Sequence, residues 1–267
     1  MKITDNTVLI TGGTGGIGFE LAKQLIALGN TVIVTGRDQA RLEAAQQKLP
    51  GLQIIKSDVA SSAAIRSLHE QAIQKFPALN IVINNAGIMK KVNLHDPQNL
   101  DELTTEIDTN LVGTVRMVSQ FLPHLKSRKN AAIMNVSSGL AFVPFAISPI
   151  YSATKAAVHS YSLSLRVQLK KTSVRVFELA PPVTETAMVD AFDREDMEGT
   201  KAMTVEALAS EAIAGMRQDR FEIRPGQSNL LQWMSRIAPS FILGQLSKSA
   251  DRMIGEPKLL GGAAVKT

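Results

Sequence analysis

The stretch "TVLITGGTGGIG", residues Thr7–Gly18, passes from a β-branched run into glycines and then into a segment of helical periodicity. The run Thr7–Thr11 predicts a strand, and regularly spaced apolar residues predict a helix over Ile17–Leu28. Glycines between a strand and a helix allow a sharp turn and let a phosphate approach the free N–H groups of the helix. The stretch therefore predicts the first strand, turn and helix of an α/β fold, with an anion site at the turn.

The five glycines satisfy two dinucleotide-binding patterns, Gly13-x-Gly15-x-x-Gly18 and Gly12-x-x-x-Gly16-x-Gly18. Such matches arise easily where glycines are frequent, so a tight turn without a ligand is the alternative. A P-loop is disfavoured because phenylalanine follows the last glycine, where that motif has lysine. The strand before the glycines and the helix after them favour the dinucleotide interpretation.

The alternation of strand and helix patterns continues along the chain. Further strands are predicted over Thr31–Thr35, Leu52–Lys56, Asn80–Asn84, Ala131–Ser137, Val174–Ala180 and Phe221–Ile223, and further helices over Asp38–Leu49, Ser61–Phe76, Leu111–Lys126, Tyr151–Lys171 and Val205–Arg217. The strands are apolar on both faces, which is typical of a parallel sheet covered by helices on both sides. We therefore expect a doubly wound α/β (Rossmann) fold, as a single domain over residues 1–267.

Two segments fall outside this alternation. Val183–Gly199 is polar and irregular, and it could form a flap over a cleft. Residues 224–267 predict a helical tail, whose part Asn229–Ile254 is amphipathic and holds the only tryptophan, Trp233. The tail could pack on the body, line a substrate mouth or join a subunit interface. Contact with a membrane surface is the alternative that we favour least.

The composition excludes several classes of protein. The hydrophobic content of 45% in 267 residues is enough for a large core. A net charge of +5 without a basic run, together with 4% aromatic residues, gives no sign of nucleic-acid binding. The absence of cysteine excludes disulfides and thiolate metal sites, and no histidine or carboxylate cluster suggests another metal site. No signal peptide or membrane-spanning run is recognisable, so we expect a cytoplasmic protein.

The end of the second strand bears on the choice of cofactor. An acidic residue there would accept hydrogen bonds from the adenosine ribose, but the chain has Gly36 and Arg37. A guanidinium suits a ribose 2′-phosphate, so we expect NADP rather than NAD. Asp38 follows directly and keeps NAD possible, unless it caps the next helix.

Both tyrosines of the chain lie in "YSATKAAVHSYS", Tyr151–Ser162. Tyr151 has Lys155 four residues later, on the same helix face, whereas Tyr161 has Leu165. A nearby cation favours the phenolate, so we expect Lys155 to lower the pKa of Tyr151 and fit it for acid–base catalysis. A tyrosine and lysine at this spacing also occur by chance.

Five strings resemble the motifs of the short-chain dehydrogenase/reductase family, in order and spacing. They are "TGGTGGIG" (Thr11–Gly18), "NNAG" (Asn84–Gly87), "NLVG" (Asn110–Gly113), "NVSSG" (Asn135–Gly139) and "YSATK" (Tyr151–Lys155). The resemblance covers roughly Asn6 to Ile223. Within the family, "PPVTET" and "IRPGQ" resemble the DltE-type bacterial oxidoreductases.

The resemblance implies a role for each matching residue. Tyr151 resembles the catalytic acid/base, Lys155 its activator and a ribose contact, and Ser138 the serine that holds the substrate oxygen. Asn110 resembles the asparagine that supports a proton-relay water, although asparagine is also a common helix cap. The implied cofactor contacts are Gly12, Thr14, Gly16, Ile17, Gly18, Arg37, Asp58, Val59, Asn84, Ala86, Gly87, Tyr151, Lys155, Pro181 and Thr186. Pro182 departs from the family pattern, which has glycine there.

Together these observations predict an NADP(H)-dependent oxidoreductase that transfers hydride between nicotinamide and a small-molecule carbonyl or secondary alcohol. The alternative is a protein of the same fold that binds the cofactor with little turnover, as a sensor or scaffold. The resemblance implies a homodimer or homotetramer, paired through the helices Leu111–Lys126 and Tyr151–Lys171. His159 is interpreted as a structural or interface residue, because neither it nor His95 has the serine and acid of a hydrolase triad nearby in the sequence.

Overall fold

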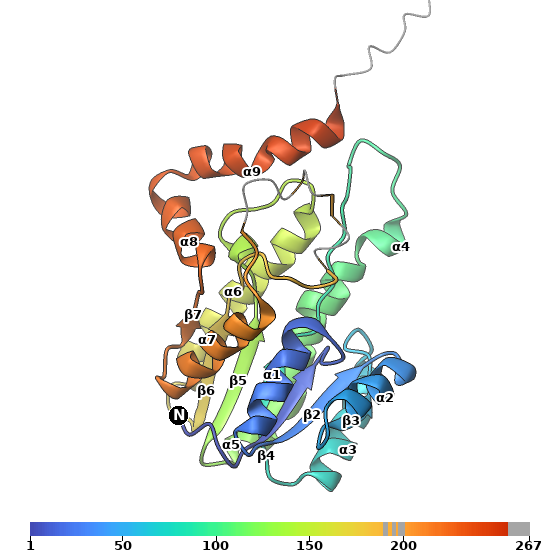
Figure 1. Cartoon of the computed structure of the whole chain (residues 1–267), viewed down its shortest axis with the longest axis vertical. Helices are drawn as coiled ribbons and strands as arrows, with labels where there is room; N and C mark the ends of the chain where they lie inside the picture. The colour runs from blue at the N-terminus through green and yellow to red at the C-terminus, as the bar shows by residue number, and fades with distance from the viewer. Residues whose placement is uncertain (189–191, 194–195, 197–200, 256–267) are drawn as a thin grey trace, which may run out of the picture.

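The computed structural model describes residues 1–188, 192–193, 196 and 201–255 (Figure 1). Within them, seven parallel strands form one sheet in the order β3-β2-β1-β4-β5-β6-β7. The strands are β1 (Thr7–Thr11), β2 (Thr31–Gly36), β3 (Gln53–Lys56), β4 (Leu79–Asn84), β5 (Ala131–Val136), β6 (Val174–Leu179) and β7 (Glu222–Ile223). The predicted doubly wound parallel sheet is confirmed. The strand order reverses between β1 and β4, which creates a crevice at their carboxyl ends.

Helices cover both faces of the sheet (Figure 1). They are α1 (Gly16–Ala27), α2 (Gln39–Lys48), α3 (Ser62–Lys75), α4 (Leu100–Leu103), α5 (Gly113–Lys126), α6 (Pro149–Leu169), α7 (Val205–Arg217), α8 (Gln227–Ile237) and α9 (Pro239–Ile254), with the π-helix η1 (Ile107–Val112) and the 3₁₀ turn η2 (Gly139–Ala141). Asp38 caps α2 and Ser61 caps α3, each accepting a backbone N–H with its side chain.

The core has two halves, one on each face of the sheet. Val8 and Ile10 of β1 join the half beneath α1, α2 and α7, while Leu9 joins the half beneath α3, α5 and α6. Successive side chains of a strand point to opposite faces, so a strand buried on both faces must be apolar at every position. This requirement explains the continuous β-branched runs of the sequence, which are buried along their whole length in β1.

Two predicted helices differ from those in the structure. The helix expected from Leu111 begins at Gly113, because the preceding residues form η1. The amphipathic tail is interrupted at Ala238, which has φ −144° and ψ 56°, and α9 begins at Pro239. A residue before proline is disfavoured in helical geometry, so the chain turns there. The short helix α4 was not predicted, because four residues give no periodic signal.

The segment after β6 is described in part. Thr184 pairs with Met203 through an isolated parallel bridge, and Thr186 approaches the glycine turn. The remainder of the expected flap, residues 189–191, 194–195 and 197–200, lies outside the described residues. In Figure 1, α9 lies at the top of the molecule, away from the N-terminus. In the part of the chain that is described, no helix combines the length and the hydropathy needed to cross a membrane.

Candidate active site

A cavity of about 1090 Å³ lies at the carboxyl ends of the strands, where the strand order reverses. Its walls come from the turns that follow β1 to β6 and from the tail helices α8 and α9. Most of the predicted site residues line it, namely Gly12, Thr14, Gly16, Ile17, Arg37, Asp58, Val59, Ala86, Gly87, Ser138, Tyr151, Lys155, Pro181 and Thr186. The fold thus gathers residues from distant parts of the sequence into one site.

The glycine turn has the shape that a phosphate group requires. Gly12 has φ +68°, and a Cβ there would lie 2.8 Å from the Cα of Ala86. Gly15 lines the cavity in extended geometry, and a Cβ there would meet nothing within 4 Å. The N-terminus of α1 has no side-chain cap and no acidic residue in its first turn. Its free N–H groups and partial positive charge therefore fit the pyrophosphate of a dinucleotide.

Gly18 and Asn84 do not line the cavity. A Cβ on Gly18 would lie 2.5 Å from the Nδ2 of Asn85, so this glycine permits close packing behind the turn. Asn84 is buried and donates from Nδ2 to the Oδ1 of Asn135 over 2.9 Å. The neighbouring Asn85, which was not predicted, lines the cavity and donates to the carbonyl oxygens of Thr11 and Gly12.

Two arginines that follow β2 also line the cavity. Arg37 and Arg41 both line it, with Asp38 between them. The carboxylate of Asp38 accepts the backbone N–H of Arg41 over 3.1 Å, so it caps α2 as well as facing the cavity. Among the described residues, the exposed guanidinium of Arg37 has no hydrogen-bond or ion-pair partner in the protein. A guanidinium without a protein partner can donate charge-assisted hydrogen bonds to the phosphate or ribose of an adenosine moiety.

Tyr151, Lys155 and Ser138 also converge on the cavity wall. The ammonium of Lys155 donates to the carbonyl oxygen of Val136 over 2.8 Å and lies 5.5 Å from the ring centroid of Tyr151. Ser138 is close enough to Tyr151 to act on its pKa as a hydrogen-bond partner, which lowers it. Ser138 also accepts the N–H of Leu140 over 3.1 Å and caps η2, so its place at a strand-ending turn is structural as well.

The pKa of Tyr151 corrects one expectation from the sequence. Burial raises it to about 12, the hydrogen bond from Ser138 acts to lower it, and the charge of Glu106 raises it further. Lys155 does not contribute to this shift, because its own pKa is the lower of the two and the lysine is uncharged at the pH where the phenol titrates. Burial lowers the pKa of Lys155 to about 8. At neutral pH the phenol therefore holds its proton and can donate it, while the lysine remains mostly charged.

Asn110 lies in the π-helix η1 and is almost fully buried. Its side chain accepts the N–H of Ile88, donates to the carbonyl oxygen of Ile88 over 2.9 Å, and donates to Thr154 over 3.1 Å. The Oγ1 of Thr154 donates in turn to the carbonyl oxygen of Tyr151. Asn110 is thus no helix cap, and it does not line the cavity. Its hydrogen bonds link the loop after β4 to the N-terminal part of α6. Its location in a π-helix is also notable, since π-helices often occur at functional sites.

Glu106, which the sequence did not single out, is fully buried near Tyr151. Its Oε1 accepts the N–H of Lys90 over 3.0 Å, while its Oε2 has no hydrogen-bond partner among the described residues. Burial raises the pKa of this carboxyl group. No motif marks Glu106, because its neighbours in the sequence are ordinary helix residues.

The region beside Tyr151 is largely apolar. Side chains of the loops after β4, β5 and β6 line it, together with two tail residues; they are Met89, Leu140, Phe145, Met188, Leu231 and Leu246. Residues of the tail helices thus line the cavity, and the choice between substrate mouth and subunit interface stays a prediction. Pro182 also lines the cavity, and its carbonyl oxygen accepts the hydroxyl of Thr184 over 2.9 Å. The second proline is thus part of the cavity wall.

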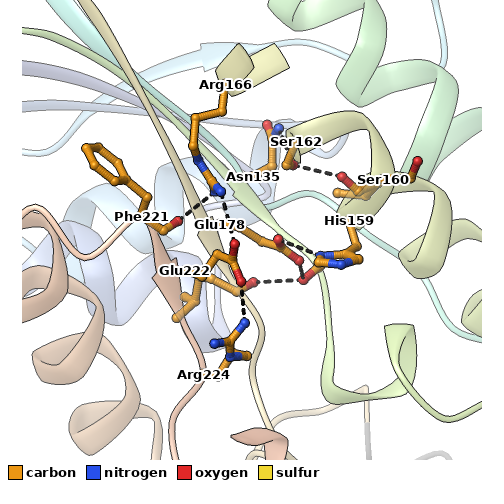
Figure 2. Close-up of polar contacts among 12 residues, drawn as sticks. Asn135, His159, Ser160, Ser162, Arg166, Glu178, Phe221, Glu222 and Arg224 are labelled. Atoms are coloured by element: carbon orange, nitrogen blue, oxygen red, sulfur yellow. Dashed lines mark hydrogen bonds and ion pairs between the residues drawn. The ribbon is translucent and has the colours of Figure 1, made fainter. Parts of the chain in front are cut away.

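The environment of His159 agrees with the expectation that it belongs to no hydrolase triad. Its Nδ1 lies 2.8 Å from the Oε2 of Glu178, whose Oε1 accepts the hydroxyl of Ser137 over 2.5 Å (Figure 2). An acid from β6 thus contacts this histidine and a serine contacts that acid, a grouping that no sequence motif indicates. The carboxylate stands between the serine and the imidazole, whereas a hydrolase triad places the imidazole in the middle. The three residues therefore do not form a hydrolase site.

Comparisons with known proteins agree with this geometry. Residues 6–197 match the family model "short chain dehydrogenase". The chain is 43% identical over 231 residues to the uncharacterized oxidoreductase DltE of Bacillus subtilis (strain 168), covering 84% of this chain and 89% of that protein. It is 34% identical over 196 residues to an uncharacterized oxidoreductase of Staphylococcus aureus (strain MW2), covering 73% and 84%.

Solved structures share the fold. A short-chain dehydrogenase/reductase of Burkholderia phymatum in complex with NAD has a TM-score of 0.81 at 20% identity, covering 92% of this chain and 96% of that chain. A short-chain dehydrogenase of Burkholderia cenocepacia with NADP has a TM-score of 0.80 at 22% identity, covering 92% and 99%. The family match, the relatives and the shared fold lead to one conclusion: the chain belongs to the short-chain dehydrogenase/reductase family, as an NAD(P)-dependent oxidoreductase of the DltE type.

Proposed function

We propose that this protein is an NADP(H)-dependent carbonyl reductase or alcohol dehydrogenase in which Tyr151 is the acid/base. The observation that carries the proposal is the convergence of Tyr151, Ser138 and Lys155 on the wall of the cavity that also contains the glycine turn. The nicotinamide, when bound, supplies or accepts the hydride at a substrate carbon. The chain's own residues then stabilise the charge on the substrate oxygen and donate or accept its proton.

Each of the three residues has a separate task. The phenol of Tyr151, protonated at neutral pH, donates its proton to the oxygen of the reduced carbonyl. The hydroxyl of Ser138 donates a hydrogen bond to the same oxygen and stabilises its developing negative charge. The ammonium of Lys155, 5.5 Å from the tyrosine ring, stabilises the phenolate that remains. In the oxidation direction the phenolate takes the proton back from the alcohol.

The proposed residues that hold the cofactor follow from the cavity. The turn of Gly12, Gly15 and Gly16 would receive the pyrophosphate, and Asp58 and Val59 would contact the adenine. The unpartnered Arg37 supports NADP over NAD, because its charge is available to a 2′-phosphate. The apolar lining beside Tyr151 supports a carbonyl or alcohol substrate with an apolar body.

We also propose that the chain forms a homodimer or homotetramer through α5 and α6. Val115 of α5 and Leu163 and Val167 of α6 are exposed apolar residues, and Val167 is 65% exposed. Burial of such side chains against a second copy would remove apolar surface from water. Small-angle scattering checks the assembly, and a strictly monomeric profile at micromolar concentration would contradict it.

The test of the catalytic proposal is a panel of aliphatic and aromatic aldehydes and ketones, followed by nicotinamide absorbance with NADPH and with NADH. We expect turnover with NADPH and a loss of at least about a hundredfold in Tyr151→Phe, with NADPH binding retained. Tyr161→Phe is the matched control, since Tyr161 lies on the same helix without a lysine partner, and it should keep its activity. Tight NADPH binding without turnover on any carbonyl would instead indicate a cofactor-binding sensor or scaffold.

A further inference from the structure

The helix α6 presents Tyr151, Lys155 and His159 on one face, because they are spaced four residues apart. Lys155 reaches the end of β5 through the carbonyl oxygen of Val136. His159, one turn further along, reaches the next residue of that segment through Glu178. The helix that carries the acid/base is therefore tied twice to the segment that carries Ser138.

Glu178 of β6 is the centre of the second tie, and it is 2% exposed. One carboxylate oxygen accepts the hydroxyl of Ser137 over 2.5 Å, and the other meets His159 Nδ1 at 2.8 Å. Figure 2 shows His159 pointing at Glu178. The nearby arginines are engaged elsewhere, because Arg166 and Arg224 both bind Glu222. Among the described residues, His159 is thus the side chain that forms an ion pair with this buried carboxylate.

The orientation of Ser138 depends on Ser137. The backbone at Ser138 is extended, with φ −167° and ψ 160°, so the two serine side chains project in different directions. The hydroxyl of Ser137 donates to Glu178, while that of Ser138 lines the cavity and acts on the pKa of Tyr151. Backbone bonds from Ser137 to Leu179 and from Gly139 to Pro181 already hold the segment against β6. The segment is therefore held in the sheet without the side chain of Ser137. The bond from that side chain to Glu178 additionally fixes the orientation of the segment.

We propose that Glu178 and His159 are positioning residues for the reaction, acting through Ser137 to keep the Ser138 hydroxyl aimed at the oxygen that Tyr151 protonates. The inference rests on the proposed function, since it assigns Ser138 the role of hydrogen-bond donor. A donor to a developing negative charge must be held within a few tenths of an ångström, so support from a buried carboxylate affects turnover more than binding.

Protonation of His159 gives this positioning a pH dependence. Charged groups face the imidazole from β6 and from the segment of β7. The hydrogen bond and charge of Glu178 raise the pKa of His159, burial lowers it, Glu222 raises it and Arg224 lowers it, for a net increase. Arg166 lies on the same helix and binds Glu222. Below this raised pKa the ion pair is complete, and the charge of His159 is lost as pH rises through it. We therefore expect kcat to decrease over that range.

The first experiment compares Glu178→Leu with Glu178→Gln, using NADPH and the fastest aldehyde of the panel. Leucine removes both hydrogen bonds, so kcat should fall about tenfold or more while the Kd of NADPH, measured by fluorescence, stays within about twofold. Glutamine can still accept from Ser137, so it should restore kcat to within about threefold of wild type. A parallel loss of NADPH affinity and kcat in Glu178→Leu, or equal kcat in all three proteins, would overturn the proposal.

The second experiment isolates the titration of His159. His159→Gln keeps a neutral donor to Glu178, so its kcat should lack the decrease with pH that wild type shows, whereas the control His124→Gln should retain it. In parallel, the imidazole of His159 is titrated by NMR in the cofactor-free protein. Its resonance is identified as the one that is missing in His159→Gln. Its pKa should fall in Glu178→Gln, which removes the carboxylate charge. An unchanged imidazole pKa, or a decrease in kcat that survives in His159→Gln, refutes the positioning pair.

The two proposals fail separately. Tyr151→Phe is measured in the same assay. If it keeps its turnover, the proposed function is wrong. If it is inactive while the Glu178 and His159 variants match wild type in kcat and pH profile, only the positioning inference is wrong.

Discussion

The ammonium of Lys155 lies 5.5 Å from the ring centroid of Tyr151, yet its hydrogen bond goes to the carbonyl oxygen of Val136, 2.8 Å away. Lysine and tyrosine thus share a helix face without a direct bond between ammonium and phenol. Both are buried, and burial favours their uncharged forms, with pKa values of about 8 for Lys155 and about 12 for Tyr151. The site holds a buried charge that the fold would be more stable without.

Replacement of this lysine should therefore stabilise the protein and inactivate it. A pKa lowered from 10.5 to about 8 corresponds to about 3 kcal/mol at about 1.4 kcal/mol per unit, and the lost hydrogen bond to Val136 offsets about 1 kcal/mol. We expect Lys155→Met to raise the free energy of unfolding by about 2 kcal/mol at pH ~7 and to abolish turnover. Urea unfolding and the NADPH assay measure the two effects. Lys170→Met, at an exposed lysine just beyond the same helix, should do neither.

The sign of the pH dependence provides an internal check on that variant. Between pH ~8 and ~10.5 the unfolded chain binds a proton at Lys155 that the folded chain has released, so the stability of wild type rises with pH. The advantage of Lys155→Met should accordingly shrink over this range. A stability difference that is constant from pH ~7 to ~10 is incompatible with a buried lysine of lowered pKa.

Arg37 should discriminate between the two nicotinamide cofactors. Its guanidinium lines the cavity, is exposed and has no partner among the described residues, so a 2′-phosphate would gain a charge-assisted hydrogen bond there. We expect Arg37→Ala to raise the Kd of NADPH by about 10- to 100-fold and that of NADH by less than about twofold, by calorimetry. Arg66→Ala, at an exposed arginine of α3, is the control. Equal losses for both cofactors would refute the 2′-phosphate contact.

The fold was predictable to the extent that apolar patterning determines it. The strand runs could be recognised because both of their faces are buried, and the parallel order of the sheet then brings their carboxyl ends to one edge. That edge is where Ser138 and the "NNAG" and glycine turns meet. The π-helix around Asn110 escaped prediction, because its six residues are too few for a changed apolar period to be recognised.

Interactions of buried charges were beyond sequence reasoning. The direction in which the pKa of Tyr151 shifts depends on whether burial or the charge of Lys155 dominates. The extent of burial cannot be read from a four-residue spacing. Similarly, Glu178 and His159 come from different elements and meet only because α6 packs on β6. The proposed preference for NADP, by contrast, rests on one residue at a strand end, Arg37, which the sequence alone is enough to single out.

Two glycines of the turn should separate cofactor binding from stability. A Cβ at Gly18 would lie 2.5 Å from Asn85 Nδ2 and 2.7 Å from the carbonyl oxygen of Gly12, so Gly18→Ala should cost about 2 kcal/mol of stability. A Cβ at Gly15 meets nothing, and its extended backbone suits any residue. Gly15→Ala should therefore unfold within about 0.5 kcal/mol of wild type but bind NADPH about tenfold more weakly. The opposite pattern would mean that the phosphate lies elsewhere.

The buried carboxyl group of Glu106 predicts the direction in which protein stability changes with pH. Its carboxylate is fully buried with one oxygen unpartnered among the described residues, and burial raises its pKa. Below the unfolded pKa both states are protonated. As pH rises from the unfolded pKa to the raised folded value, the unfolded chain releases its proton while the folded chain retains it, so stability falls. Glutamine can accept the N–H of Lys90 without that charge.

The free energy of unfolding of Glu106→Gln, relative to wild type, should therefore rise from pH ~4 to ~7. The exposed neighbour Glu102→Gln should show no such trend. Because the charge of Glu106 raises the pKa of Tyr151, the same variant should also lower the phenol's titration midpoint, which ultraviolet absorbance follows. A flat stability difference, together with an unchanged tyrosine midpoint, would show that folding does not raise the pKa of Glu106 and that its charge does not act on the phenol of Tyr151.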